Sequence, residues 1–296
     1  MKLHRVFIQI AGITHCITSI DPTLKLQIDG QTQRFITPET TPDINIKAGW
    51  DDLAQICFGG KRIFDSGSVW QLYQTEEDYI FSLNSPVFGP LPYKVARVRK
   101  DFTGSEVFLH RSYFDPNRAL YPLEYPLDEL LFIHFLTQGN GVEIHASGVI
   151  DSLGQGHLFV GQSGAGKTTI SRLWLHEPGV TILSDDRIAL RKMDGGLWMY
   201  GTPWHGEGGM ASPSRAPLTG IYFLIKGEKN ELLSVREAEA AARLFTCSFP
   251  PFYSSASLDF TLGFLGEVVK AIPCYGLRFL PDRRVVEFIQ GLSKGD

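Results

Sequence analysis

Alternation of apolar and polar residues is the main pattern of the first 115 residues. It occurs in four segments, 6–10, 24–28, 44–48 and 79–83, which are separated by turns rich in Gly, Pro, Asn and Asp. A period of two places alternate side chains on one face of a strand, so it is typical of a sheet with one buried face. The pattern predicts an antiparallel, β-rich domain over residues 1–120, for which a structural role is the simplest expectation.

The pattern changes after a proline-rich segment, 115–126. Apolar residues then recur every three or four positions from 127 to 135, and the sequence Gly-Asn-Gly at 139–141 follows as a helix-ending signal. Apolar segments at 142–149 and 157–160 indicate two strands, and strand-like and helix-like segments alternate from there to the C-terminus. This order predicts an α/β domain over residues 121–296.

The segment from Gly161 to Thr168 fits the phosphate-loop pattern of Gly, four residues and Gly-Lys-Ser/Thr. Glycines allow successive backbone N–H groups to reach phosphate oxygens, the lysine carries charge to the β- and γ-phosphates, and the hydroxyl ligates Mg²⁺. An apolar strand-like segment precedes this segment, and a helical pattern follows it. The alternative, a glycine-rich turn with an exposed lysine, would require neither of these flanking elements, so their presence favours a phosphate loop. The residues expected to bind the nucleotide are Gly161, Ser163, Gly164, Ala165, Gly166, Lys167, Thr168 and Thr169.

Two consecutive carboxylates end the next apolar segment. Asp185 and Asp186 follow residues 180–184, and Asp185 comes 18 residues after Lys167. One carboxylate can hold Mg²⁺ while the other accepts a proton from an attacking hydroxyl, and parallel strands would bring the pair beside the phosphate loop. The alternative is a solvated turn. The short gap favours a kinase over motor ATPases, and the lack of an Asn-Lys-x-Asp sequence disfavours a switch GTPase.

These segments together resemble a known family. Residues 141–149, 156–168 and 183–187 follow the order found in the catalytic domain of HPr kinase/phosphorylase, which phosphorylates a serine of a bacterial phosphocarrier and shares its nucleotide-site fold with phosphoenolpyruvate carboxykinase. The resemblance implies that Asp185 is the catalytic base, that Asp186 and Thr168 lie near Mg²⁺, and that His145 and Lys167 belong to the active site. It covers about residues 142–206 and does not extend to the first 120.

Two features depart from that family. The stretch expected to carry a second metal-binding glutamate is here 201–209, in which Glu207 is the candidate. The family's arginine-bearing loop is not recognisable, and Ser212-Pro213-Ser214-Arg215 is the candidate replacement. The sequence is more similar to divergent HPr-kinase-like proteins of peptide-maturation clusters, which phosphorylate a serine of a precursor peptide. The family's catalytic domain forms hexamers, so a homo-oligomer stays open.

Composition and charge bear on the binding partners and on the cellular compartment. The formal net charge is −4, which disfavours a nucleic-acid or membrane surface, and no apolar run approaches the roughly 18 residues of a membrane span. The cysteines, Cys16, Cys57, Cys247 and Cys274, form no CxxC pair and are expected to be buried thiols in a cytoplasmic protein.

The sequence therefore predicts a kinase that uses ATP, with GTP left open, and Mg²⁺. The expected acceptor is a hydroxyl group, foremost a serine of a peptide or protein. A small-molecule kinase and a nucleotide-sensing module without catalysis are the alternatives. An arginine-rich lid would favour the former, and tight ATP binding without turnover the latter.

Overall fold

The computed structural model describes residues 4–53 and 59–292, and the chain divides into two compact units, Met1–Phe135 and Leu136–Asp296. The sequence-based boundary at 120/121 differs from this division, because segment 121–135 belongs to the first unit. The class is mixed α/β, with a large mixed sheet in each unit. None of the helices in the described ranges is long and apolar enough to span a bilayer.

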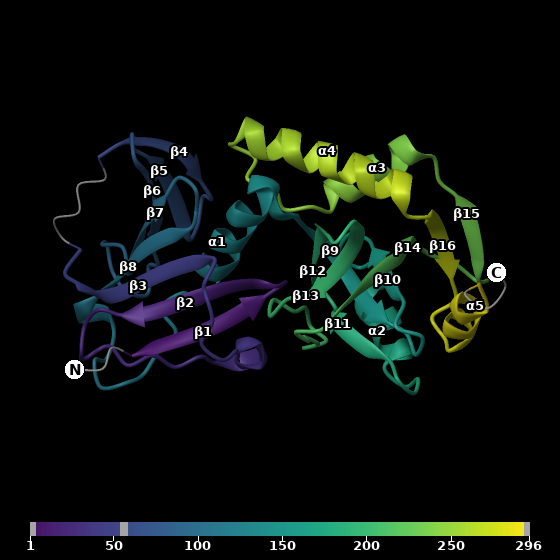
Figure 1. Cartoon of the computed structure of the whole chain (residues 1–296), viewed down its shortest axis with the longest axis horizontal. Helices are drawn as coiled ribbons and strands as arrows, with labels where there is room; N and C mark the ends of the chain where they lie inside the picture. The colour runs from purple at the N-terminus through teal and green to yellow at the C-terminus, as the bar shows by residue number, and fades with distance from the viewer. Residues whose placement is uncertain (1–3, 54–58, 293–296) are drawn as a thin grey trace. The chain divides into compact units, whose positions relative to one another are not determined.

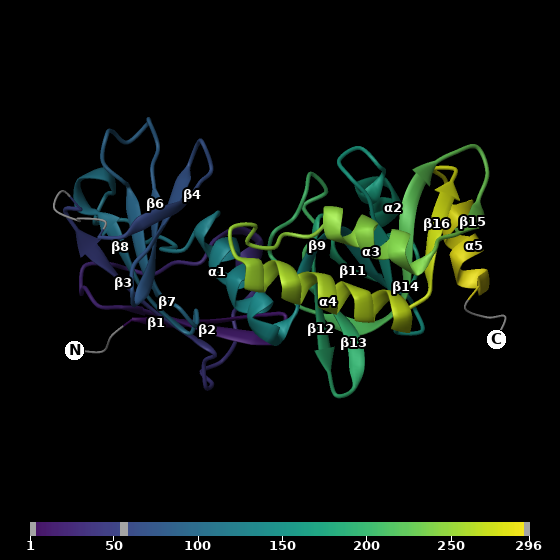
Figure 2. The ribbon, with the colours of Figure 1, turned by 90° about the horizontal axis from the view of Figure 1, so that it is seen from above.

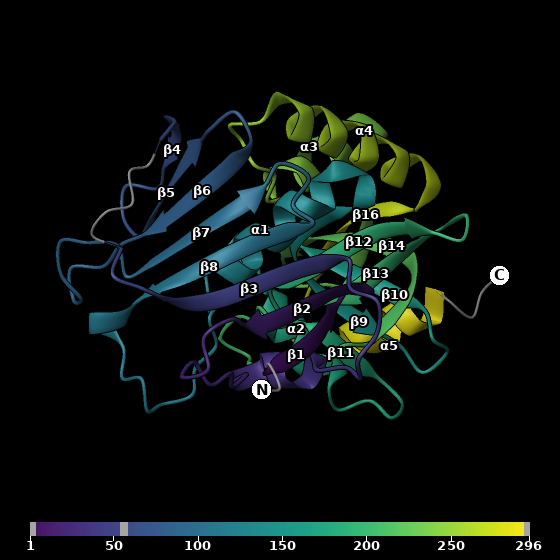
Figure 3. The same cartoon turned by 60° about the vertical axis from the view of Figure 1, so that its left-hand side comes forward.

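The first unit is built on an eight-stranded sheet of order β1-β2-β3-β8-β7-β6-β5-β4 (Figure 3). The neighbours β2 and β3, and β3 and β8, run parallel, while the other pairs are antiparallel. The bounds are β1 Arg5–Ile10, β2 Ile13–Ser19, β3 Ile44–Asp51, β4 Lys61–Asp65, β5 Trp70–Gln74, β6 Asp78–Leu83, β7 Lys94–Arg99 and β8 Gly104–His110, with short 3₁₀ turns at Gly30–Phe35 and Arg111–Tyr113.

Three of the four alternating segments are confirmed as strands, namely β1, β3 and β6. The fourth, 24–28, is not a strand: Leu24, Leu26 and Ile28 are buried as the alternation implies, yet the segment forms only an isolated bridge between Leu26 and Leu120. Its backbone N–H at Leu26 donates to Nδ1 of His4 rather than to a neighbouring strand. Alternating burial therefore does not by itself imply that a segment is hydrogen-bonded to a neighbouring strand.

Helix α1, Leu127–Phe135, packs on the sheet of the same unit and confirms the predicted helix. The ring of His134 stacks on Phe102, with centroids 4.6 Å apart, and meets Phe81 edge-on at 5.4 Å. After Phe135 the chain continues through a short turn of helix, Leu136–Asn140, in which Gly139 has a φ of 97°. The glycine allows this left-handed end, as the sequence pattern predicted.

The second unit has the element order β9 Val142–Ile150, β10 Gly156–Val160, α2 Lys167–Trp174, β11 Thr181–Ser184, β12 Arg187–Met193, β13 Gly196–Gly201, β14 Arg215–Lys226, β15 Glu231–Ser234, α3 Glu237–Thr246, α4 Ser255–Ala271, β16 Cys274–Phe279 and α5 Arg284–Leu292 (Figure 1). The strand order is β10-β9-β12-β13-β14-β16-β15. Because β10 also pairs with β14, strands β9, β12, β13, β14 and β10 close into a ring.

Helices cover both faces of this sheet. Helices α3 and α4 lie side by side along one face, and α2 and α5 lie on the other (Figures 1 and 2). The first face buries Ala240 and Leu244 of α3 with Leu265 and Val268 of α4. The second buries a separate cluster, in which Trp174 of α2 is completely enclosed. Each helix thus contributes one apolar face, as amphipathic helices on a sheet do.

The pairing around β9 brings together the carboxyl ends of two strands of this unit, β10 and β11. Strands β10 and β11 are both antiparallel to β9 and pair with its second half, so they run in the same direction. Their carboxyl ends therefore emerge together. The chain after β10 enters the glycine-rich loop, and the chain after β11 enters the Asp185-Asp186 turn.

Candidate functional site

The glycine-rich loop joins β10 to α2 and has the backbone of a strand-to-helix turn. Gly164 and Gly166 have φ values of 79° and 109°, which L-residues rarely adopt. A Cβ on Gly166 would also lie 2.8 Å from Cζ of Phe279, and one on Gly161 would lie 2.5 Å from Cβ of Ala165. The conformation therefore favours glycine at 164 and 166, and close packing favours it at 161 and 166.

The N-terminus of α2 faces this loop without a side-chain cap among the described residues. Uncapped N–H groups and the helix dipole together favour an anion at such a position. Gln162, Ser163, Gly164 and Thr169 are exposed, so the loop can be reached from solvent. Its geometry therefore suits a phosphate group.

Lys167 is the first residue of α2 and is buried. Its Nζ donates to the carbonyl oxygen of Gly161 at 2.9 Å and to that of Gln162 at 3.4 Å. Burial lowers the pKa of this amine from its ordinary value, an effect that the charge of Arg187 increases and the carboxylates of Asp186 and Asp185 oppose. The amine is folded over its own loop and is partnered only by neutral carbonyl oxygens among these hydrogen bonds, so an incoming anion can draw it away.

Asp185 is buried, with 1% of its surface exposed. The N–H of Gly206 donates to Oδ1 at 3.0 Å, and the N–H of Gly208 donates to Oδ2 at 2.8 Å. The hydroxyl of Thr168 also donates to Oδ2, at 3.4 Å. The carboxylate is therefore held between the glycine-rich loop and the loop 206–209.

Asp186 points to a different environment and is partly exposed, with 24% of its side chain accessible. Nε2 of His145 donates to its Oδ1 at 2.9 Å, and the guanidinium of Arg187 donates to its Oδ2. Burial raises the pKa of Asp186, but the hydrogen bond from His145 and the charges of Arg187 and Lys167 outweigh it, so the pKa lies below its ordinary value. The group is a carboxylate at neutral pH.

The backbone explains why these two carboxylates diverge. The hydroxyl of Ser184 accepts hydrogen bonds from the N–H groups of Asp186 and Arg187, which tightens the turn after β11. The N–H of Ala146 in β9 donates to the carbonyl of Asp186 at 3.1 Å. Asp185 is thereby turned inward, and Asp186 is turned toward His145 of β9.

The structure gathers most of the sequence-predicted site residues. The loop 161–169, Asp185, Asp186 and His145 lie at one edge of the second unit, on β9, α2 and the turn after β11. Glu207 is exposed in the loop that wraps Asp185, and no cluster of three or more His, Cys, Asp or Glu able to hold a metal ion occurs in the described residues. Arg215 stacks on Trp198 and donates to the hydroxyl of Tyr200, both in β13.

Sequence reasoning missed three parts of the site. Gly206 and Gly208 bind Asp185 through their backbones, and a Cβ on Gly208 would lie 2.5 Å from its Oδ2. Phe249 presents its ring to the guanidinium of Arg187 at 4.1 Å. Burial raises the pKa of the Cys247 thiol, and the nearby charge of Lys167 opposes that effect. The glycine spacing at 206–209 was the one available signal.

The cysteines agree with the expectation of buried thiols where they are described. Cys16 and Cys247 are buried free thiols, and Cys274 is partly buried. Cys57 lies outside the described residues. The pKa of Cys274 is raised by burial to about 11, so this thiol is protonated at neutral pH.

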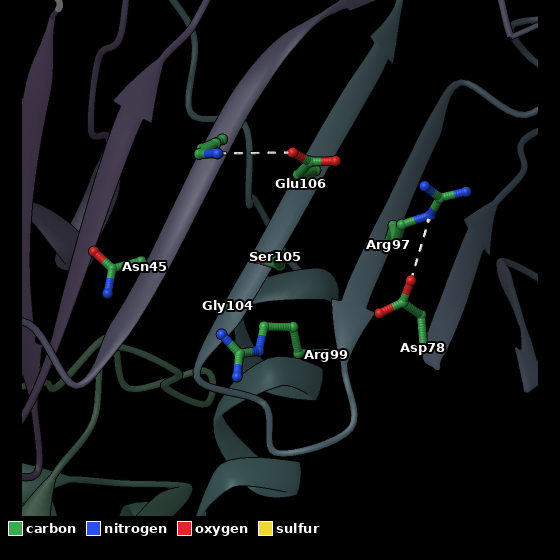
Figure 4. Close-up of a pocket in the computed structure, with 8 residues that line it drawn as sticks. Asn45, Asp78, Arg97, Arg99, Gly104, Ser105 and Glu106 are labelled. Carbon is green, nitrogen blue, oxygen red and sulfur yellow. Dashed lines mark ion pairs between the residues drawn. The ribbon is translucent and has the colours of Figure 1, made fainter. Parts of the chain in front are cut away.

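The first unit carries a separate hollow on its sheet (Figure 4). It is lined by Asn45, Lys47, Asp78, Arg97, Arg99 and Glu106 from four strands. Its charges are largely paired, because Lys47 lies 3.9 Å from Glu106 and Arg97 lies 3.7 Å from Asp78. Asp78 and Glu106 are half-buried and the other four residues are exposed, and together they form a polar sheet surface to which we assign no chemistry.

Comparison with protein-family models and with curated proteins gives no match to the chain. The geometry of the second unit is therefore the basis for assigning a function.

Proposed function

We propose that the chain is a kinase that transfers the γ-phosphoryl group of ATP to a hydroxyl, foremost a serine of a peptide or protein. One observation carries the proposal: the uncapped N-terminus of α2, with Lys167, lies beside two consecutive carboxylates that face different surroundings. Phosphoryl transfer needs both a phosphate cradle and a proton acceptor, and this edge offers both. The proposed fold of the second unit is the HPr-kinase-like, phosphoenolpyruvate-carboxykinase-like nucleotide-binding fold.

The residues fit a bound Mg²⁺–nucleotide. The backbone N–H groups of the loop and of α2 would hold the phosphates, and Lys167 would reach the β- and γ-phosphates. Thr168 and Asp185 would hold the ion, directly or through water, as expected for a cation that keeps few protein ligands. Mg²⁺ supplies positive charge that orients the phosphates and neutralises the charge developing between them.

The geometry leads us to exchange the roles that the family resemblance implied for the two carboxylates. Asp185 is enclosed and already accepts three hydrogen bonds, one of them from the metal-binding hydroxyl. Asp186 is partly exposed and is oriented by His145. We therefore assign Asp186 as the general base and Asp185 to the metal, with His145 as the positioning residue for the base.

The proposed reaction exchanges one phosphorus–oxygen bond for another. A bond forms between the acceptor hydroxyl oxygen and the γ-phosphorus, while the bond between that phosphorus and the β–γ bridging oxygen breaks. The hydroxyl proton passes to Asp186, and ADP leaves with the electron pair of the broken bond.

Transfer of radiolabelled γ-phosphate from ATP tests the proposal. Serine- and threonine-containing peptides and free serine are supplied as acceptors, with Lys167→Ala as the inactive control. Labelled phosphoester that depends on Lys167 supports a kinase, and its position on peptide or free serine separates the two acceptor classes. ATP binding without label transfer to any hydroxyl or to water would replace the kinase by a nucleotide-sensing module.

A further inference from the structure

Arg187 occupies an unusual position between an acid and an aromatic ring. Its guanidinium donates to Oδ2 of Asp186 and lies over the ring of Phe249, 4.1 Å from the centroid. The side chain of Arg187 is 17% exposed and that of Asp186 is 24% exposed, so both border solvent. The face of the guanidinium is supported by the ring, while its edge carries the hydrogen bond.

The backbone of Arg187 is fixed independently of this side chain. Arg187 of β12 pairs with His145 of β9. Its backbone N–H donates to Oγ of Ser184, and its carbonyl oxygen accepts a hydrogen bond from the hydroxyl of Thr202. The side chain can therefore change partner without a change in the strand. Contact with Phe249 would persist, because cation–π attraction holds the guanidinium by its face and leaves its five N–H donors at the edge.

The contact with Arg187 also restricts Asp186. His145 holds Oδ1, and Arg187 holds Oδ2. Both carboxylate oxygens are thus occupied by neighbouring side chains. Departure of one donor opens an oxygen to the acceptor hydroxyl.

An incoming γ-phosphoryl group supplies a reason for that departure. Phosphoryl transfer spreads negative charge over three equatorial oxygens, and a planar guanidinium is well suited to pair with two of them. Arg187 donates to Asp186, whose carboxylate is also close enough to Lys167 for their charges to attract. A phosphate bound by Lys167 would therefore attract the guanidinium as well.

We propose that Arg187 is a further catalytic residue, which exchanges the Asp186 carboxylate for the γ-phosphoryl oxygens as phosphoryl transfer begins. This inference rests on the proposed function. The exchange stabilises the transferring group and at the same time releases Oδ2 of Asp186 to accept the hydroxyl proton. Phe249 holds the guanidinium within reach of both partners.

The test compares two ligands that differ only in the phosphoryl mimic. Affinities for MgADP and for MgADP with aluminium fluoride are measured by calorimetry on the full chain. Arg187→Ala is expected to bind MgADP within about threefold of the wild type and to bind the aluminium fluoride complex at least ~100-fold more weakly, as for an arginine acting on the transition state. Arg187→Lys is expected to lose about tenfold, because it keeps charge but not the planar pair of donors.

Arg243→Ala is the matched control. Arg243 also joins a carboxylate, Glu239 at 2.6 Å, to a phenylalanine ring, Phe223 at 5.4 Å, but on α3. This variant should bind both ligands like the wild type. Phe249→Leu should weaken the aluminium fluoride complex by roughly three- to tenfold and leave MgADP unchanged.

The outcomes distinguish failure of the proposed function from failure of the role proposed for Arg187. If the wild type binds neither ligand, the proposed function fails and Arg187 with it. If the wild type binds both and Arg187→Ala does the same, the proposed function stands and Arg187 is only part of a structural ion pair. Equal loss of both ligands in Arg187→Ala and Arg187→Lys would assign the arginine to ground-state binding or to folding, and would also overturn the inference.

Discussion

The hydroxyl of Thr168 lies 3.4 Å from Oδ2 of Asp185, although 17 residues separate them in the chain. Asp186, the next residue, instead meets His145 at 2.9 Å. The turn that follows β11 thus directs the Asp185 carboxylate to the glycine-rich loop and the Asp186 carboxylate to β9. This divergence is the basis of the roles proposed for the two acids.

The first prediction separates those roles. Asp186→Asn should lower the rate of phosphoryl transfer at least ~100-fold, the range of a lost general base, while MgADP affinity stays within about threefold. Asp185→Asn should instead raise the Mg²⁺ concentration needed for half-maximal rate, because the amide carries no charge for the ion. Rates measured in an Mg²⁺ titration decide between them. Transfer at the wild-type rate in Asp186→Asn would assign the base elsewhere.

The second prediction concerns the fit of the loop against β16. Gly166→Ala should reduce the free energy of unfolding by more than the roughly 1–2 kcal/mol that a left-handed conformation costs an L-residue, because its Cβ would also meet the Phe279 ring at 2.8 Å. Gly164→Ala is the control, with a φ of 79° and no atom within 4 Å of the added Cβ. Urea titrations of both variants give the difference.

Replacing the ring tests the cause of that difference. In Gly166→Ala/Phe279→Leu the clash is relieved, so the double variant should lose less than the sum of the two single losses. Additive losses would show that backbone strain alone limits position 166.

The third prediction is a pH dependence of stability in the first unit. Burial lowers the pKa of His134 to about 4 from an ordinary value near 6.5. Between these values the unfolded chain binds a proton that the folded chain does not, so stability falls as pH falls through this window. The loss is complete below pH 4 and amounts to about 3 kcal/mol for this group. His15 is shifted in the same direction by burial, against an opposing effect of Asp43.

His134→Leu isolates this effect. The difference in unfolding free energy between the variant and the wild type should change by about 1.4 kcal/mol per pH unit between pH 6 and pH 4.5 and be constant above pH 7. His176→Gln, at an exposed position after α2, is the matched histidine substitution outside the core of the first unit. A constant difference for His134→Leu across the range would contradict this prediction, because it would mean that the pKa of the ring is the same in the folded and the unfolded chain.

The sequence was informative where local rules act. The period of two located β1, β3 and β6, and the period near 3.6 with a glycine end located α1. The phosphate loop could be placed because strand, glycines and helix are contiguous in the chain. Segment 24–28 shows the limit, since its alternation reports burial on one side but not whether a neighbouring strand is there to pair.

The rest of the site depends on contacts that no local pattern records. The pairing of β10 with β14, which closes the ring of strands in the second unit, joins segments about 60 residues apart in the chain. Phe249 reaches Arg187 because the backbone after α3 returns to β9, where the N–H of Phe249 donates to the carbonyl of Glu143. Which of two adjacent aspartates faces inward is decided by Ser184 and by the loop 206–209, and a motif cannot distinguish them.

Calorimetric titration with MgADP tests the central claim, a nucleotide phosphate site at Gly161–Thr168, most directly. We expect saturable one-to-one binding to the wild type and to Lys192→Ala, whose exposed amine pairs with Glu267 away from the loop. Lys167→Ala should bind at least ~10-fold more weakly, because it lacks the charge that reaches the phosphates. No binding to the folded wild type at millimolar MgADP, or equal affinity in Lys167→Ala, would contradict the account.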